Sequence, residues 1–150
     1  EKMPEYIRNR KLLGLEFSGI YSGFLGSDAQ IDIVENFIRD FRTEQTLVII
    51  DPVMGDYGKA YATFTPTLCK SMKRLVQYAD ILAPNLTEAC ILTDTPYKEK
   101  WRKKEIRELA VKLMEMGPSK VVITGIVQGS YIANYVCDEK NVSIFCEPSV

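Results

Sequence analysis

The sequence predicts an α/β domain with a mostly parallel sheet and helices on both faces, arranged in three layers. Short apolar runs of strand length alternate with stretches in which apolar residues recur at helical spacing. Two of these runs, residues 46–51 and 120–124, are nearly continuous apolar segments, as in strands that are covered on both faces. The last segments, 130–138 and 141–147, are joined by a short polar turn and predict an antiparallel hairpin at the edge of the sheet.

Helix signals are clear in the first half of the chain. Gly14 stands where glycine commonly ends a helix. Ser27 can cap a helix whose apolar residues repeat every three or four positions, and Thr65 precedes a proline, which is a typical helix start. The predicted elements are a helix at 3–14, a strand at 17–23, a helix at 27–41, a strand at 46–51 and a helix at 65–78.

The second half begins after a stretch that has neither strand nor helix periodicity. Residues 52–65 contain two glycines and a proline and predict a loop long enough to be functional. Beyond the helix that follows it, the predicted elements are a strand at 80–85, a helix at 85–92, a turn at 93–97, a helix at 101–116, a strand at 120–124 and the final hairpin.

Composition narrows the function classes. The chain has 150 residues with 19 basic and 20 acidic side chains, so it presents no net positive charge to a nucleic acid or an anionic membrane, and we expect neither partner. No apolar run approaches the length of a membrane-spanning helix. The chain has no histidine, which excludes Ser-His-Asp or Cys-His catalysis and His-ligated metals within it. The chemistry must depend on carboxylates, hydroxyls, lysines, backbone amides or a bound cofactor.

The cysteines predict free thiols rather than a metal or disulfide framework. None belongs to a C-x-x-C pair, and their neighbours are apolar. We therefore expect buried, reduced thiols in a cytoplasmic protein. The cysteines are Cys69, Cys90, Cys137 and Cys146.

The chain contains no internal repeat or interdomain linker, so we expect residues 1–150 to belong to one domain. It begins with a helix that no strand precedes and reaches Val150 directly after a strand. We therefore expect both ends to be cut and the domain to be incomplete.

Polar and turn-forming residues collect where the predicted strands end. Ligands of open parallel sheets bind beyond the carboxyl ends of the strands, so these residues should share one edge. The strand exits are Ser22–Gly23, Asp51, Pro84–Asn85 and Thr124–Gly125. No G-x-G-x-x-G follows a strand and no G-x-x-x-x-G-K-[ST] occurs, so a dinucleotide-binding or P-loop site is poorly supported.

Each candidate also has a simpler interpretation. Asp51 can be a strand-ending turn residue or a carboxylate that faces a cation. Asn85 and Glu88 have the spacing of a helix capping box, which is compatible with a second role near magnesium and water. Thr124 alone is typical of a strand, and Phe24 is interpreted as a core residue in preference to a substrate-stacking one.

Four segments carry a family resemblance. YSGFLGS, IIDPVMGDYGKAY, DILAPNLTEACIL and VVITG together resemble the pyridoxal (vitamin B6) kinases of the ribokinase-like superfamily, in that family's order and spacing. The combination of D-P-V-M-G-D at one strand exit and A-P-N-x-x-E at the next is specific. The alternative is the hydroxymethylpyrimidine kinases of thiamine synthesis, which share D-P-V-M and P-N-x-x-E but usually lack the G-D-Y-G continuation found at 55–58.

The resemblance implies a role for each matching residue. Asp51 resembles the aspartate near the nucleotide phosphates and their cation, and Glu88 resembles the glutamate that binds magnesium through water. Residues 55–65 match a flap that closes over ATP, in which Asp56 approaches the γ-phosphate. The further candidates are Ala83, Asn85 and Thr124 for ATP, and Ser22 and Phe24 for the pyridine pocket.

The resemblance also implies an activity. It predicts transfer of the ATP γ-phosphoryl group to the 5′-hydroxyl of pyridoxal, pyridoxine or pyridoxamine, with Mg²⁺, by a cytoplasmic homodimer. The preferred vitamer and a monovalent-cation requirement stay open. The family's catalytic aspartate lies in a G-T-G-D motif that this chain lacks, so we expect the base beyond Val150, and we expect the chain alone, as the central part of a kinase domain, to be inactive. A non-catalytic nucleotide-binding domain is the second alternative.

Overall fold

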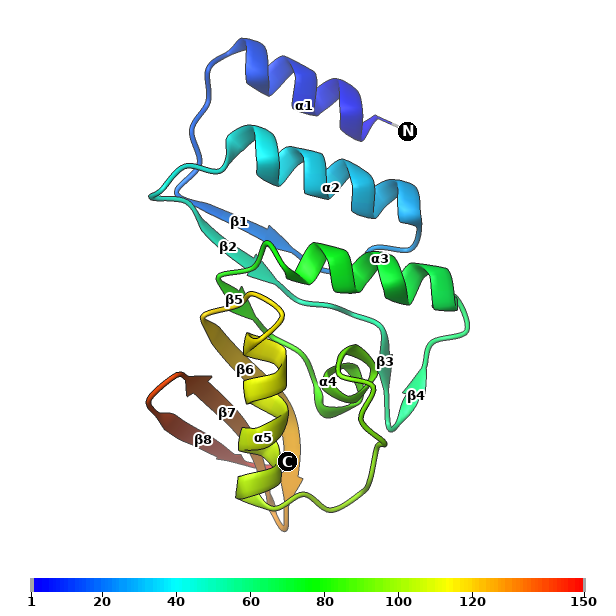
Figure 1. Cartoon of the computed structure of the whole chain (residues 1–150), viewed down its shortest axis with the longest axis vertical. Coiled ribbons are helices and arrows are strands. Elements are labelled where there is room, and N and C mark those ends of the chain that lie inside the picture. Colours follow the sequence, from blue (N-terminus) through cyan, green and yellow to red (C-terminus); the bar gives the residue numbers. More distant parts are fainter. Residues whose placement is uncertain (1, 150) are drawn as a thin grey trace.

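The computed structural model describes residues 2–149 and contains a six-stranded sheet (Figure 1). Four strands pair in parallel, and β7 and β8 add an antiparallel hairpin at one edge. This confirms the predicted α/β class and the edge hairpin. In sheet order, the strands are β1 (Gly19–Ser22), β2 (Leu47–Ile50), β5 (Ile81–Leu82), β6 (Lys120–Gln128), β7 (Tyr131–Asp138) and β8 (Val142–Pro148).

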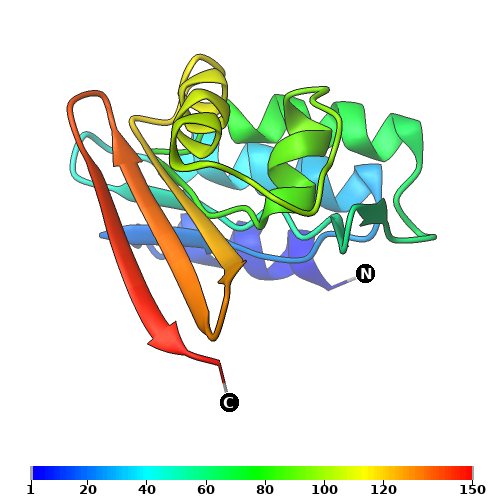
Figure 2. The same ribbon diagram turned by 90° about the horizontal axis from the view of Figure 1, so that it is seen from below.

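Five helices accompany the sheet in the described residues. In chain order, they are α1 (Met3–Leu12), α2 (Asp28–Phe41), α3 (Pro66–Val76), α4 (Leu86–Leu92) and α5 (Lys103–Met114). Figure 2 shows α3, α4 and α5 on the same side of β1 and β2. Helix α1 packs beside α2. The parallel strands are added to the sheet one after another in the same direction. Right-handed crossovers between such strands place all the connecting helices on one face of the sheet.

Burial along the strands follows this arrangement. Ile20, Val48 and Leu82 point toward the helices and are buried, whereas Tyr21 and Ile49 on the opposite face are exposed or half-buried. Within residues 2–149, the helices therefore cover one face of the sheet. The helices that we predicted on the second face are not among these residues.

The helix starts form for the reasons that the sequence indicated. Ser27 accepts a hydrogen bond from the backbone N–H of Gln30 at 3.3 Å, and Thr65 accepts one from Leu68 at 3.2 Å, with proline in the first helical turn that follows. These side chains satisfy amide groups that the first helical turn cannot pair. Both predicted helix caps are confirmed.

Two segments differ from the prediction. The loop at 52–65 contains a small antiparallel hairpin, β3 (Gly55–Asp56) and β4 (Lys59–Ala60). The strand predicted at 120–124 continues to residue 128, and its pairing with β7 shifts between Ile123 and Ile126. The local sequence pattern does not predict either feature. The hairpin depends on a particular turn conformation, and the strand extension depends on pairing with a distant segment.

The prediction of buried thiols is wrong for Cys146. This residue lies opposite Ala133 on the edge strand β8 and is exposed because no further strand or helix of the described range covers it. Cys90 and Cys137 are buried, Cys69 is half-buried, and all four thiols are free.

None of the helices within residues 2–149 combines the length and apolar content that crossing a lipid bilayer requires.

Asp80 fastens three strands at their amino ends, opposite the edge that carries the candidate site. Its carboxylate accepts the backbone N–H of Val48 at 2.7 Å and pairs with Arg42 at 2.6 Å. Its carbonyl accepts the N–H groups of Ser119 and Lys120, both at 3.1 Å. One residue therefore connects β2, β5 and β6.

We predict that Asp80→Ala lowers the free energy of unfolding by about 2 kcal/mol, because the Val48 amide and the Arg42 guanidinium lose a charged acceptor. Urea unfolding measures the change. Glu108→Ala is the matched control, since its 3.8 Å pair with Lys104 is exposed and contributes less than about 0.5 kcal/mol. Equal effects of the two substitutions would contradict the fastening role.

Candidate functional site

The carboxyl ends of the parallel strands meet at one edge, as predicted. The N–H of Asp51 donates to the carbonyl of Ser22 at 2.8 Å, and the N–H of Ala83 donates to the last residue of β2 at 2.9 Å. Thr124 forms an isolated bridge with Asn85, although it lies inside the extended β6 rather than at its end. The backbone of five candidates is thus joined across neighbouring strands.

Asn85 and Glu88 form the predicted capping box at the start of α4. The Asn85 side chain accepts the N–H of Glu88 at 2.9 Å, and the Glu88 carboxylate accepts the N–H of Asn85 at 2.8 Å. The structural interpretation of this motif is therefore confirmed. Glu88 is only 4% exposed, which is unusual for a carboxylate and leaves room for a second role.

The same two side chains also hold the segment after β2. The second carboxylate oxygen of Glu88 accepts the N–H of Met54 at 3.1 Å, and the Asn85 amide donates to the carbonyl of Gly55 at 2.8 Å. Gly55 fits here because a Cβ would lie 2.3 Å from the carbonyl oxygen of Lys59. The capping box therefore fixes the base of the β3–β4 hairpin to the helix.

Burial raises the pKa of Glu88 to about 7, and the negative charge of Asp51 adds to the rise. The amides of Asn85 and Met54 oppose this effect but do not cancel it. Asp51 is half-buried and accepts the Tyr21 hydroxyl at 2.9 Å. That hydrogen bond raises the pKa of Tyr21, because the neighbouring carboxylate disfavours loss of the phenolic proton.

The two carboxylates suit a magnesium ion that keeps most of its shell as water and phosphate. Within residues 2–149 no group of three acidic or thiol side chains could enclose an ion. Mg²⁺ commonly binds through one or two carboxylates plus substrate phosphates. Both oxygens of Glu88 already accept amide hydrogens, which favours contact through water. Asp51 and Glu88 therefore fit the ion, and neither forms a closed metal site.

Asp56 lies on the exposed hairpin that these contacts support. Its carboxylate accepts the N–H of Tyr57 at 2.8 Å. It lines a depression of about 110 Å³ together with Asn85 and Thr87. The predicted flap residue and the start of α4 thus face the same space.

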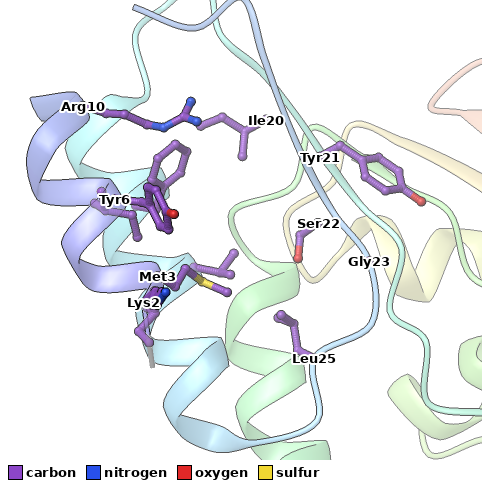
Figure 3. Close-up of a pocket in the computed structure, with 13 residues that line it drawn as sticks. Lys2, Met3, Tyr6, Arg10, Ile20, Tyr21, Ser22, Gly23 and Leu25 are labelled. Carbon is purple, nitrogen blue, oxygen red and sulfur yellow. The ribbon is translucent and has the colours of Figure 1, made fainter. Parts of the chain in front are cut away.

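The two candidates for the pyridine pocket, Ser22 and Phe24, do not line the depression that Asp56 and Asn85 share. Ser22 is buried and lines a pocket of about 560 Å³ between α1, β1 and α2, in which Met3 and Tyr6 also lie (Figure 3). Tyr21 points away from the labelled side chains of α1, and neither Asp51 nor Phe24 lines the pocket.

Phe24 is 57% exposed, so its interpretation as a core residue is wrong. It follows the end of β1, where no described element covers it.

Two residues of the site were missed from the sequence. Thr87 is buried and accepts the N–H of Gly58 at 2.8 Å, while Tyr21 binds Asp51. Side chains alternate between the two faces of a sheet. If this alternation is extended by one residue beyond β2, it places Asp51 on the same face as Tyr21. The contact of Thr87 had no local signal, because Gly58 lies 29 positions away.

Residues 10–150 match the model of the family described as phosphomethylpyrimidine kinase. Pyridoxal kinase from Arabidopsis thaliana is 32% identical over 120 residues, which are 79% of this chain and 38% of that protein. The chain therefore spans less than half the length of this curated relative.

Solved structures agree with the fold. A Bacteroides thetaiotaomicron protein provisionally named phosphomethylpyrimidine kinase has a TM-score of 0.96 at 36% identity, over 99% of this chain and 52% of that one. A second crystal form of it, with pyridoxal, has a TM-score of 0.91 at 36% identity, over 99% of this chain and 54% of that one. Pyridoxal kinase from Lactobacillus plantarum has a TM-score of 0.87 at 25% identity, over 99% of this chain and 52% of that one.

The raised pKa of Glu88 predicts a pH dependence of stability. Because the folded pKa of about 7 lies above the ordinary 4.5, the folded protein holds a proton that the unfolded chain releases. The stabilisation that protonated Glu88 gives the folded state is fully present below pH 4.5 and is lost as the pH rises through 7. Between pH 5 and pH 8 the loss is about 2 kcal/mol.

Urea unfolding in a metal chelator at these two pH values tests this. Glu88→Gln should lack this part of the pH dependence, whatever its stability at a single pH. Glu99→Gln, at an exposed position between α4 and α5, should keep it. The same pH dependence in wild type and Glu88→Gln would show that Glu88 ionises normally.

Proposed function

The chain belongs to the phosphomethylpyrimidine kinase family, and we propose that the protein containing it phosphorylates the 5′-hydroxyl of pyridoxal, pyridoxine or pyridoxamine with ATP. The observation that carries the proposal is the pair of carboxylates, Asp51 and Glu88, at the ligand edge of a chain whose Bacteroides relative crystallised with pyridoxal. Because the chain spans about half of that relative, the activity is assigned to the full-length protein.

Phosphoryl transfer suits this arrangement because it needs positioning and charge neutralisation more than covalent help from the protein. Magnesium, when bound with ATP, would neutralise charge on the phosphates. Asp51 and Glu88 are the residues that would hold it, with Glu88 acting through water. Ala83 and Asn85 follow the end of β5, and Thr124 within β6 pairs with Asn85. These three residues are proposed to line the nucleotide site.

The β3–β4 hairpin is the proposed flap. Asp56 lies on its exposed side near the start of α4, a position from which it can approach the terminal phosphate when the hairpin covers ATP. Covering the site would exclude water and so suppress unproductive ATP hydrolysis. Ser22 and Phe24 remain the candidates for contact with the pyridine ring.

Several parts of the proposal concern the whole protein. The catalytic base is proposed to be an aspartate that follows a glycine-rich turn after residue 150. We further propose a homodimer in the cytoplasm, and the four free thiols support a reducing compartment.

Hydroxymethylpyrimidine kinase activity is the second candidate, favoured by the description of the matching family model. The G-D-Y-G sequence at residues 55–58, which lies in the β3–β4 hairpin, favours the vitamin B6 substrates because the hydroxymethylpyrimidine kinases usually lack it. We predict that the full-length protein has a kcat/KM for pyridoxal at least about tenfold above that for hydroxymethylpyrimidine, because a site built for one substrate's polar groups leaves them unpaired with the other. Coupled measurement of ADP release on both substrates tests this, and the reverse preference would favour the second candidate.

We predict that Asp51→Asn lowers kcat about 100-fold and raises the Mg²⁺ concentration needed for half-maximal rate, because a neutral amide stabilises the ion and phosphates less well. The asparagine oxygen can still accept the Tyr21 hydroxyl, so the fold should persist. Steady-state kinetics across a magnesium titration measures both changes. Glu108→Gln, on the exposed surface of α5, should change neither; an unaltered magnesium requirement in Asp51→Asn would remove Asp51 from the cation site.

A further inference from the structure

The tip of the β3–β4 hairpin has a conformation that needs support. Gly55 pairs with Ala60 and Asp56 with Lys59, so that two residues, Tyr57 and Gly58, make the turn. Both have left-handed backbones, with φ of 48° and 77°. Two such residues in succession are typical of a type I′ hairpin turn, in which glycine is favoured at both positions and tyrosine is strained.

The tip itself is exposed. All residues from 56 to 60 are exposed, and the Tyr57 side chain is 86% exposed. A two-stranded hairpin of this length cannot hold itself in place in water. Its position must therefore come from contacts with other elements.

Two contacts restrain the tip, and both come from outside the hairpin. The N–H of Gly58 donates to the buried hydroxyl of Thr87 on α4 at 2.8 Å. The ring of Tyr97, in the connection between α4 and α5, packs directly on Gly58: a Cβ there would lie 2.5 Å from the ring's Cδ1 and 2.9 Å from Cε1. Burial and the nearby charge of Asp56 raise the pKa of Tyr97, as expected of a ring that covers the flap.

The tip contacts differ from those at the hairpin base. Asn85 and Glu88 bind Met54 and Gly55, which belong to the ligand edge itself. Tyr97 lies at 38% exposure beyond α4 and lines the depression that Asp56 also lines. It can therefore restrain the tip without being part of the cation site.

We propose that Tyr97 is a positioning residue that clamps the tip of the hairpin through Gly58 and thereby sets where Asp56 stands over the phosphoryl-transfer site. This inference rests on the proposed function for the role of Asp56. The clamp itself is a property of the structure and can be tested without activity. The contact is made by the ring, since the hydroxyl of Tyr97 has no hydrogen-bond partner in the described residues.

Trypsin cleavage after Lys59 measures opening of the hairpin. In the full-length protein, Tyr97→Ala should speed cleavage at this bond about tenfold, because the tip opens more often once the ring is gone. Tyr97→Phe keeps the ring and should be cleaved like wild type. Tyr131→Ala, an exposed tyrosine on β7, controls for general loosening. Cleavage of Tyr97→Ala at the wild-type rate would overturn the clamp.

A double-mutant cycle isolates the contact. Gly58→Ala carries both backbone strain and the clash with the ring, whereas in the Tyr97→Ala background only the strain remains. The second alanine should therefore speed Lys59 cleavage less in the Tyr97→Ala background than in wild type. Strict additivity would show that the ring does not press on Gly58, and this comparison holds even if either single variant is less stable.

Kinetics then test the consequence for the reaction. Tyr97→Ala should raise KM for ATP and lower kcat together, each by about tenfold, as expected when a lid is displaced, and Tyr97→Phe should restore both. Faster cleavage with wild-type kinetics would refute the positioning role. If the wild-type protein phosphorylates no B6 vitamer, the proposed function fails, while the protease experiments still decide the clamp.

Discussion

The reciprocal hydrogen bonds between Asn85 and Glu88 are the constraint on which the candidate site depends. They start α4 at the end of β5 and use the same two side chains to hold the chain that leaves β2. A helix cap is normally a local device that satisfies its own first turn. Here it also joins the exits of two strands that are adjacent in the sheet, so the start of α4 and the position of the hairpin base follow from one motif.

The burial of Glu88 close to Asp51 has an electrostatic cost, which a bound cation would offset. A carboxylate as buried as Glu88 loses much of its hydration, and Asp51 nearby adds repulsion, so the free protein tends to keep a proton that an exposed glutamate would release. A cation placed between these groups and the phosphates would reverse both effects. The strands are fastened at the opposite end by Asp80, so the ligand edge can carry this destabilising pair while the sheet stays in register.

The sequence was sufficient for structural features that depend on local spacing. The cap at Asn85 and Glu88 and the exit residue Asp51 follow from neighbouring residues and strand periodicity, and the structure places all three together. The hairpin within 52–65 and its contact with Tyr97 could not be predicted, because a left-handed turn and a contact across 39 positions have no periodic signal. Exposure of Phe24 was missed because an aromatic residue after a strand is usually covered.

The most direct test of the account is the titration of Glu88 itself, followed by carbon-detected NMR of the side-chain carboxyl in the full-length protein. The account predicts an apparent pKa of about 7 without metal and a clear fall when Mg²⁺ and a non-hydrolysable ATP analogue are added, because the ion favours the charged carboxylate. An ordinary value near 4.5 that does not respond to magnesium and nucleotide would contradict both the buried carboxylate and its place at the phosphate site.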